Sequence, residues 1–281
     1  MAIGFGNNIL ASDYNSIQST VASILGSGSG DRGYGQAVSS GQVNTNNTIT
    51  ASQMQNLKSD LDKIRYHQAN AASTAPSVSA GGVIYASDWS TYSSQASSLD
   101  GTRLNLATEQ ASLSTAVNKT ANNNTWNTSI THTYTVSFGS VDEARYFFNA
   151  GGEVRISASI TGFTNSTTKG GRWNNLFSTA GIIKFKAYAT TASGGSASAI
   201  GWYNLSGTQQ IFSIVDSGTY SGNDWTITAS KSSTSLSLTL QYNDDGSTGI
   251  QDENVDGTLT SSVSSLRASG AYVNVAGPSI G

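Results

Sequence analysis

The sequence predicts an α+β protein, in which a region of short helices precedes an antiparallel β-sandwich of jelly-roll-like type. The pattern I-x-A-S occurs three times in the first third, each time followed by apolar residues at helical spacing. From Trp126 onward, apolar and polar residues instead alternate with a period of two. The polar run NKTANNNT at 118–125 separates the two patterns. We therefore expect a helical docking and assembly region at 1–120 and a β-sandwich domain at 125–281.

Each I-x-A-S unit predicts one short amphipathic helix. The units are ILASDYNSIQSTVASILG at 9–26, ITASQMQNLKSDLDKIRY at 49–66 and IYASDWSTYSSQASSLDG at 84–101. A serine hydroxyl can accept a hydrogen bond from a free N–H of the first turn, so we expect Ser12, Ser52 and Ser87 to be the N-caps. Steps of three and four residues place the apolar side chains on one face of each helix. They are Tyr14, Ile17, Val21 and Ile24; Met54, Leu57, Leu61 and Ile64; Trp89, Tyr92, Ala96 and Leu99.

Helices of this length are marginal in water, so their apolar faces need a partner. An intramolecular bundle and an assembly around an oligomer axis both satisfy this requirement. The connection GSGSGDRGYGQAVSSGQVNTNNT is a long loop whose glycine content leaves its order open. We expect the core on the assembly side to contain Tyr14, Ile17, Val21, Met54, Leu57, Leu61, Trp89 and Tyr92.

The rest of the chain has the pattern of about eight half-buried strands, which is enough for a sandwich. The segment TWNTSITHTYTVSF shows the alternation clearly, because its Trp, Ile, Tyr, Val and Phe residues are interleaved with Asn, Ser and Thr. Two short helices are expected within this part. One is SVDEARYFFNAGG, with Ser140 as its cap, and the other is GGRWNNLFSTAG, which ends near Gly181.

Composition excludes several classes of function. The 281-residue chain has only 11% charged residues and a net charge of −3, so it has no basic surface for nucleic acid. It contains no cysteine, which removes disulfides and thiolate metal sites. The segment MAIGFGNNILAS lacks a basic stretch followed by an apolar run, and no stretch of 18 apolar residues occurs. We therefore expect neither classical secretion nor insertion into a membrane.

The one candidate metal site is a calcium loop at Asp252, Asn254 and Asp256. These residues, followed by Gly257, match the opening D-x-N-x-D-G of such a loop, in which alternate oxygens converge on a hard cation. The twelfth position is Val263, where a calcium loop has a bidentate Glu. An acidic hairpin turn is the simpler interpretation, and we expect no other cofactor.

No catalytic motif accompanies the two histidines, His67 and His132. The acids Asp142 and Glu143 are expected in the first turn of a helix, where the helix dipole stabilises negative charge. Glu153 is expected to begin a strand. We therefore predict no enzymatic activity and no catalytic residue.

Three stretches resemble virion structural proteins of tailed bacteriophages, particularly those common in phages of cyanobacteria and other marine bacteria. They are ASDYNSIQSTVASILGSGSGDRGYGQ with ITASQMQNLKSDLDKIRYHQ, then ARYFFNAGGEVRISAS, and finally DGTLTSSVSSLRASGAYVNV. Such proteins belong to tail fibres, collars or necks. The resemblance implies a virion location, other virion proteins as partners, and homo-oligomeric assembly, with a trimer suggested by analogy with fibres.

Two functions follow as expectations. The first is a non-enzymatic structural component of the tail, collar, neck or fibre apparatus, which assembles through its helical region. The alternative is a receptor-binding or glycan-binding module that holds a host surface sugar through Tyr or Trp side chains and the loop from Asp252 to Asp256. A polysaccharide depolymerase is a weaker third interpretation.

Overall fold

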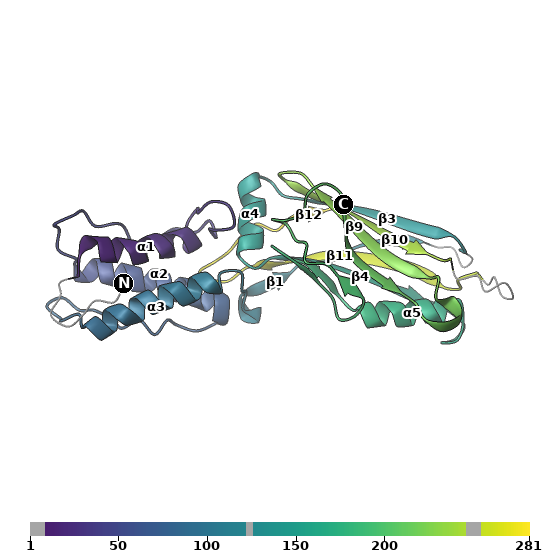
Figure 1. Ribbon diagram of the computed structural model, residues 1–281, viewed down its shortest axis with the longest axis horizontal. Helices are drawn as coiled ribbons and strands as arrows, with labels where there is room; N and C mark the ends of the chain where they lie inside the picture. Colours follow the sequence, from purple (N-terminus) through teal and green to yellow (C-terminus); the bar gives the residue numbers. More distant parts are fainter. Residues whose placement is uncertain (1–8, 122–125, 246–253) are drawn as a thin grey trace. The chain divides into compact units, whose positions relative to one another are not determined.

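The computed structural model describes residues 9–121, 126–245 and 254–281 and confirms the expected α+β class with a β-sandwich (Figure 1). The chain forms two compact units. The first unit contains Met1–Ser112, Arg145–Gly152 and Arg267–Ala276. The second unit contains Leu113–Ala144, Glu153–Leu266 and Gly277–Gly281.

This division differs from the single boundary expected between residues 120 and 125. Two segments from the later part of the chain belong to the helical unit, and they add Ala150, Ala268, Val273 and Val275 to its core. Their membership depends on tertiary packing, which a change in local sequence period does not reveal.

The three I-x-A-S units form α1 (Ala11–Leu25), α2 (Ala51–Ala69) and α3 (Ala86–Gly101). Each helix begins before the serine that we expected to cap it, so the prediction of Ser12, Ser52 and Ser87 as N-caps is wrong. The N-caps are Leu10, Thr50 and Tyr85.

The third helical residue of each unit explains this earlier start. Its side chain accepts a hydrogen bond from the N-cap backbone N–H, which is one half of a capping box. The acceptors are Asp13 Oδ2 at 2.9 Å, Gln53 Oε1 at 2.7 Å and Asp88 Oδ2 at 3.0 Å. In α2 the box is complete, because Thr50 Oγ1 also accepts from the backbone N–H of Gln53 at 3.3 Å.

The isoleucine of each unit lies one residue before the N-cap, and an apolar residue occupies the fourth helical position. This is the spacing of a hydrophobic staple, in which the two side chains pack together across the helix start. All six residues belong to or pack against one core cluster: Ile9 and Tyr14, Ile49 and Met54, Ile84 and Trp89. The repeated pattern therefore specifies where each helix begins and orients its first turn against the common core.

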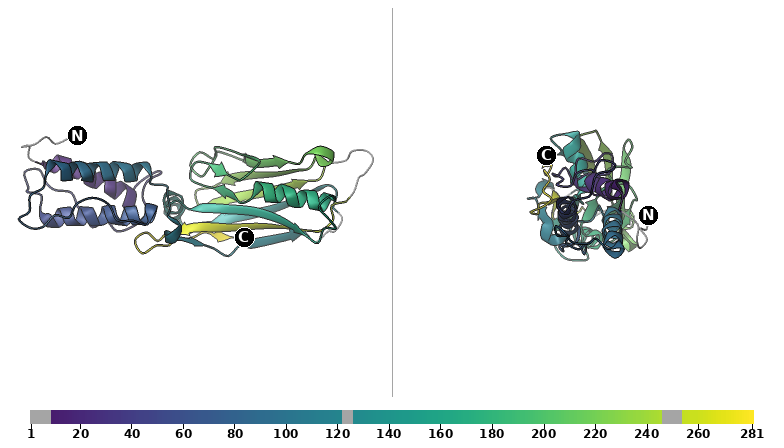
Figure 2. Two further views of the ribbon diagram at one scale, coloured as in Figure 1. Left: turned by 90° about the horizontal axis from the view of Figure 1, so that it is seen from below. Right: turned by 90° about the vertical axis from the view of Figure 1, so that its left-hand side faces the viewer.

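The three helices run parallel to one another (Figures 1 and 2). Near the helix starts, the Tyr14 hydroxyl donates to the Gln53 carbonyl at 3.1 Å. At the opposite ends, Gln68 Nε2 donates to the Leu99 carbonyl at 2.9 Å. Parallel neighbours require each connection to return along the bundle, which explains the long segments at 26–50 and 70–85.

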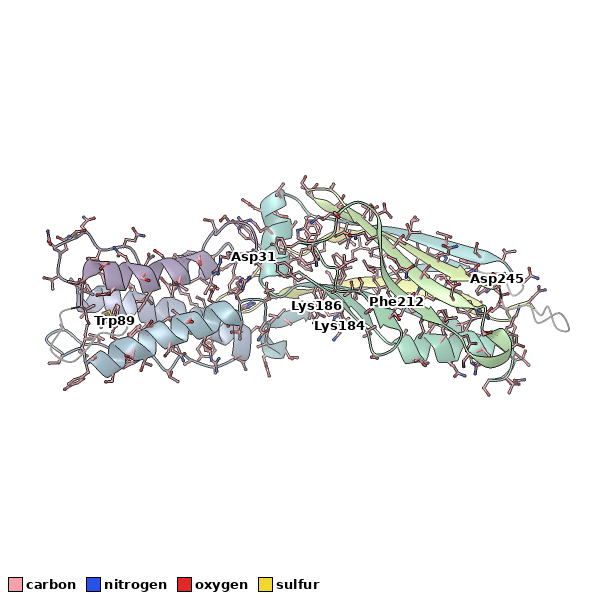
Figure 3. All side chains as sticks on the ribbon, viewed as in Figure 1. Asp31, Trp89, Lys184, Lys186, Phe212 and Asp245 are labelled. Carbon is pink, nitrogen blue, oxygen red and sulfur yellow. The ribbon has the colours of Figure 1, made fainter. Side chains whose placement is uncertain are left out.

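The helix faces are buried within one chain. Every residue expected in the assembly-side core is at most 6% exposed, including Trp89, which is labelled in Figure 3. The intramolecular bundle is therefore the arrangement adopted. These side chains form the core of the helical unit, and any contact with another chain has to use different residues.

The glycine-rich connection after α1 is an ordered part of this unit. Arg32 pairs with Asp100, and Arg103 pairs with Asp31. Between these ion pairs, Tyr34 is buried and receives a hydrogen bond from Gln68 Nε2 at 2.9 Å. The connection is thus held to the C-terminal ends of α2 and α3.

The second unit is a sandwich of two sheets. One sheet has the order β1-β11-β4-β5-β6, with β2 also paired to β11, and the other has the order β12-β3-β10-β9-β8-β7. The strands are β1 (Ala111–Leu113), β2 (Val117–Ala121), β3 (Ser129–Ser137), β4 (Glu153–Thr161), β5 (Ile183–Phe185), β6 (Thr190–Thr191), β7 (Ser196–Ala197), β8 (Gln209–Val215), β9 (Asp224–Lys231), β10 (Ser235–Asn243), β11 (Thr258–Ala268) and β12 (Ser279–Ile280). The two expected helices are present as α4 (Val141–Asn149) and α5 (Lys169–Ala180).

A polar group at the centre of the sandwich links the two sheets. Ser261 of β11 is fully buried, and its hydroxyl bonds to Tyr242 of β10 at 2.7 Å and to His132 Nδ1 of β3 at 2.5 Å. The Tyr134 hydroxyl donates to the Ser261 carbonyl at 2.9 Å. Since buried polar groups are costly when unsatisfied, this group favours one alignment of the two sheets.

The glycine loop provides a test of tight packing in the helical unit. Gly35 has φ +71°, and a Cβ there would lie 2.5 Å from the Tyr146 ring. We expect Gly35→Ala to lower the free energy of unfolding by about 2 kcal/mol, through backbone strain and overpacking. Gly41→Ala is the matched control, because a Cβ at that position would meet no atom within 4 Å. Denaturant titration followed by helical circular dichroism measures both, and equal stabilities would contradict the packing argument.

Candidate functional site

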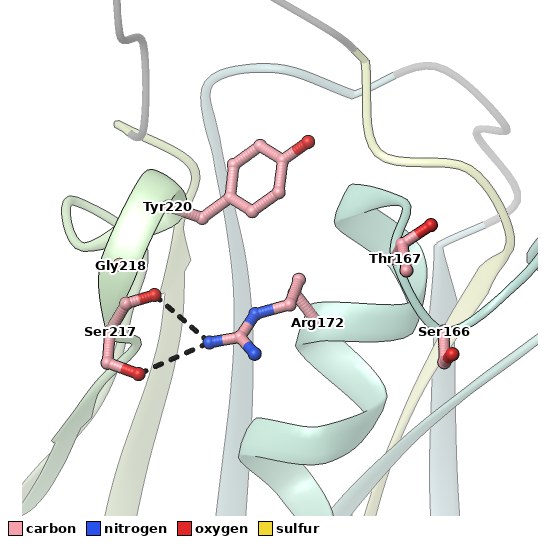
Figure 4. Close-up of a pocket in the computed structure, with 6 residues that line it drawn as sticks. All are labelled: Ser166, Thr167, Arg172, Ser217, Gly218 and Tyr220. Carbon is pink, nitrogen blue, oxygen red and sulfur yellow. Dashed lines mark hydrogen bonds between the residues drawn. The ribbon is translucent and has the colours of Figure 1, made fainter.

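The second unit contains a pocket of about 390 Å³ at the start of α5 (Figure 4). One wall comes from the residues just before α5 and from its first turns, and the other comes from the short 3₁₀ turn at Gly218–Tyr220 and the residue before it. The lining residues are Ser166, Thr167, Arg172, Ser217, Gly218 and Tyr220.

Arg172 is held rigidly at the wall of this pocket. Its Nε donates to Asp216 Oδ2 at 3.1 Å, and its Nη2 donates to Asp216 Oδ1. Nη2 also donates to the carbonyl and hydroxyl oxygens of Ser217, at 3.0 and 3.3 Å. These bonds use one edge of the guanidinium, and no described residue accepts from Nη1, which has no dashed line in Figure 4. A planar group fixed on one edge offers donors in a defined direction on the other.

The chain around the start of α5 is shaped by backbone capping. Thr168 is the N-cap, and its hydroxyl accepts from the Gly171 N–H at 3.3 Å. The Asp256 carboxylate accepts from the Gly170 N–H at 3.0 Å and from the Thr164 N–H. A Cβ on Gly170 would lie 2.2 Å from the Asp256 carbonyl oxygen, so glycine is required for this close approach.

The charges of the pocket are compensated within the protein. Asp216 balances Arg172, and Asp256 already occupies N–H groups at the N-terminus of α5. An anionic ligand therefore gains little net charge attraction here. The pocket offers hydroxyl groups from Ser166, Thr167 and Ser217, guanidinium donors and the Tyr220 ring, which suit an uncharged polyhydroxylated ligand.

In the candidate calcium loop, the Asp256 side chain is already used to cap backbone N–H groups. Asp252 lies outside the described residues, and Asn254 is exposed. Burial acts to raise the pKa of Asp256, but hydrogen bonds from Thr164, Thr168 and Gly170 hold this pKa below its usual value. Among the described residues, no group of three or more His, Cys, Asp and Glu side chains is arranged to hold a metal ion. Calcium would have to displace the backbone donors that Asp256 accepts from.

The two histidines have structural environments in different units. His67 is 1% exposed and packs edge-on against Tyr34, with ring centroids 4.7 Å apart. Burial lowers the pKa of His67 to about 4, although the Ala150 backbone opposes this shift. Burial and the Lys119 charge lower the pKa of His132, so both rings are neutral at neutral pH.

The acidic residues also have local roles. Asp142 and Glu143 lie in the first turn of α4, as expected, and Glu143 accepts from the Gly139 N–H at 3.0 Å. Glu153 begins β4, also as expected, and pairs with Arg155 at 2.9 Å and Lys186 at 3.1 Å.

Sequence reasoning did not identify Arg172, Asp216 or Tyr220 as a group. Arg172 lies within a helix that was expected, but Asp216 and Tyr220 lie in the polar turn DSGTYSGND, which carries no motif. No local spacing relates Arg172 to residues more than forty positions away, such as Asp216. Only the sandwich brings these segments together.

Comparisons with known proteins leave the chain without an assigned relative. No protein-family model matches it, and no curated protein or solved structure does so either. Within the described residues, no helix combines the length and apolar character that a membrane span requires.

The capping role of Asp256 can be tested directly. Asp256→Asn replaces one acceptor oxygen with an N–H₂ donor that faces a backbone donor, so we expect the free energy of unfolding of the β-sandwich to fall by about 1–2 kcal/mol. Asn254→Ala, at an exposed position, is the control and should change stability by less than about 0.5 kcal/mol. Calorimetric titration of both variants with calcium separates the alternatives. Calcium binding that Asp256→Asn abolishes would show that the carboxylate is a ligand.

Proposed function

We propose that this chain is a non-enzymatic structural subunit of a tailed-phage virion, in the tail, collar, neck or fibre apparatus. The sequence resemblance supports the proposal, and the structure indicates what the resembling segments do. In YFFNAGGE, Phe147, Phe148 and Ala150 are fully buried. DGTLTSSV covers the start of β11, the strand that pairs with both β2 and β4. The shared segments therefore specify architecture, as expected for a family defined by its place in a particle.

The observation that carries the proposal is an exposed apolar surface at one end of the helical unit. Leu10, Val83 and Tyr85 are 60%, 71% and 63% exposed. Leu10 and Tyr85 are the N-caps of α1 and α3, and Val83 lies two residues before Tyr85. Because the helices are parallel, these side chains lie at the same end of the unit, which we call the apolar end. Grouped exposed apolar residues are typical of surfaces that contact another protein.

This surface takes over the docking role that we first gave to the helix faces. The faces are used within the chain, whereas the described side chains of the apolar end are exposed. The helical unit would bind other virion proteins or sibling chains through it, and the β-sandwich would form the exposed body.

Locating the chain in a particle tests the proposal as a whole. Purified virions from a phage that encodes this protein would be analysed by mass spectrometry and labelled with antibody for electron microscopy. We expect the chain in a stoichiometric amount at the tail, collar or neck. Complete, infectious particles that lack the protein would refute the proposal.

The apolar end can be tested separately. We expect Leu10→Ser combined with Tyr85→Ser to lower incorporation into particles at least about ten-fold, because two apolar side chains would lose a burial worth about 1.5–3 kcal/mol each. Val215→Ser, at a 58% exposed position on β8, is the matched control and should be incorporated normally. Incorporation is measured by complementing a deletion phage with each variant. An equal loss in the control would show that exposed apolar residues matter only for solubility.

A second candidate function is recognition of a host surface glycan, and the pocket at Arg172 favours it. The pocket combines an aromatic ring, several hydroxyl groups and a guanidinium that Asp216, behind the lining, holds in place. These groups suit a sugar, whose ring has an apolar face and whose edge carries hydroxyl groups. The expected participation of Asp256 is not supported, because its carboxylate caps backbone N–H groups.

A glycan array tests this second function. We expect the protein to retain uncharged glycans, and Arg172→Lys to weaken retention at least about ten-fold, because an ammonium cannot reproduce the planar fork of donors. Tyr188→Ser is the control, since Tyr188 is an exposed aromatic residue outside the pocket lining. If Tyr188→Ser loses retention and Arg172→Lys does not, the glycan site does not lie at Arg172. If the array retains no glycan on the wild-type protein, glycan recognition is excluded.

A further inference from the structure

A lysine and an aspartate are buried together in the second unit. Lys169 Nζ lies 3.1 Å from Asp244 Oδ2, and the two side chains are 1% and 0% exposed. Lys169 is the first residue of α5, and Asp244 follows directly after β10. The Asp244 backbone is itself fixed, because its N–H donates to the Thr128 carbonyl at 2.7 Å. Two reactive groups are therefore held within contact distance by separate elements.

Aromatic side chains lie near this buried pair. The Tyr220 ring centroid lies 6.0 Å from Lys169 Nζ. Trp173, one turn further along α5, and Tyr242, two residues before Asp244, are both buried, with ring centroids 6.3 Å apart. In such a setting, separated charges are poorly solvated, and an ion pair recovers little of the cost of leaving water.

We propose that Lys169 and Asp244 condense to form an amide bond between Nζ and Cγ, which covalently links α5 to the end of β10. The reaction converts the ammonium and the carboxylate into an amide and one water molecule. The Nζ–Cγ bond forms and one Cγ–Oδ bond breaks. Of the three ammonium protons, one stays on the amide nitrogen and two leave on the departing oxygen as water. No electrons are transferred, so no oxidant, reductant or further reactant is required.

Two physical effects favour the condensation in this site. Fixing the groups within contact distance replaces an encounter in solution, and well-oriented intramolecular reactions reach effective concentrations of about 10⁵ M or more. The product is also neutral, so it removes the cost of keeping two charges in an apolar environment. The reaction begins with proton transfer from the ammonium to the carboxylate, which leaves Nζ with the lone pair that attacks Cγ.

The link would have a structural consequence for a chain without cysteine. It would close the chain between Lys169 and Asp244 into a covalent loop that includes α5, β5 to β9 and β10. Closing a loop restricts the unfolded chain, in the way that a disulfide does. Unlike a disulfide, an amide bond is not reversed by reduction, so the body of the protein would resist unfolding in any redox environment.

Intact-mass spectrometry of the folded, full-length protein tests the proposal. We expect a mass lower than that of the sequence by one water, and a proteolytic fragment in which the peptides containing Lys169 and Asp244 are joined. Cleavage by trypsin after Lys169 should also be absent. A mass equal to that of the sequence would overturn the proposal.

Lys169→Arg is the matched variant, because it keeps the positive charge and the ion pair but should retain the full mass. Its folding is confirmed by the near-ultraviolet circular dichroism of the buried tryptophans. A succinimide at Asp245–Gly246 would also lose one water, but it does not depend on Lys169. Loss of water that persists in Lys169→Arg would therefore overturn the proposal. A loss of ammonia together with a link from Lys169 to Asn223 would also overturn the proposal. Asn223 directly precedes Asp224, and Asp224 pairs with Asn243 in the β9–β10 register.

Discussion

The helical unit depends on the burial of three short apolar helix faces against one another within a single chain. Helices of 15, 19 and 16 residues have little stability of their own in water. Each is therefore directed by its first turn, where an isoleucine before the N-cap and an apolar fourth residue pack into the common core. Because all three starts have the same construction, all three helices enter the core in the same way and run parallel.

The parallel arrangement has consequences for the rest of the unit. Parallel helices need long return connections, and the connection after α1 is fixed by ion pairs to Asp100 in the last turn of α3 and to Arg103 just after that helix. The bundle is then completed by segments from far along the chain, including Ala150 and Val273. The arrangement also places two N-caps with exposed apolar side chains at the same end, so the apolar end is a by-product of helix direction.

The second unit is organised by buried polar groups as well as by its apolar core. Ser261 joins three aromatic side chains from the facing sheet, and Lys169 meets Asp244 at the edge of an aromatic cluster. Unsatisfied partners at either place would be costly, so both places restrict how the sheets and α5 fit together. In the pocket, the Arg172 guanidinium has a defined orientation because it donates to Asp216 and Ser217. Rigid donors with compensated charge are suited to selecting a ligand by shape and hydroxyl pattern.

Local sequence determined the period of each region, and therefore the existence of the three helices, the strands with clear alternation such as β3, and both α4 and α5. It also determined which faces are apolar, because helical and extended backbones have fixed side-chain periods. It did not determine where Leu10, Thr50 and Tyr85 cap their helices, since serine and its neighbours compete for that role and the outcome depends on the side chain three positions later. Tertiary structure alone decided that the apolar helix faces are buried within one chain and that Asp256 caps backbone N–H groups. It alone also decided that Arg172 forms an ion pair with Asp216. Those outcomes depend on contacts between residues distant in sequence, whose energies have no local pattern.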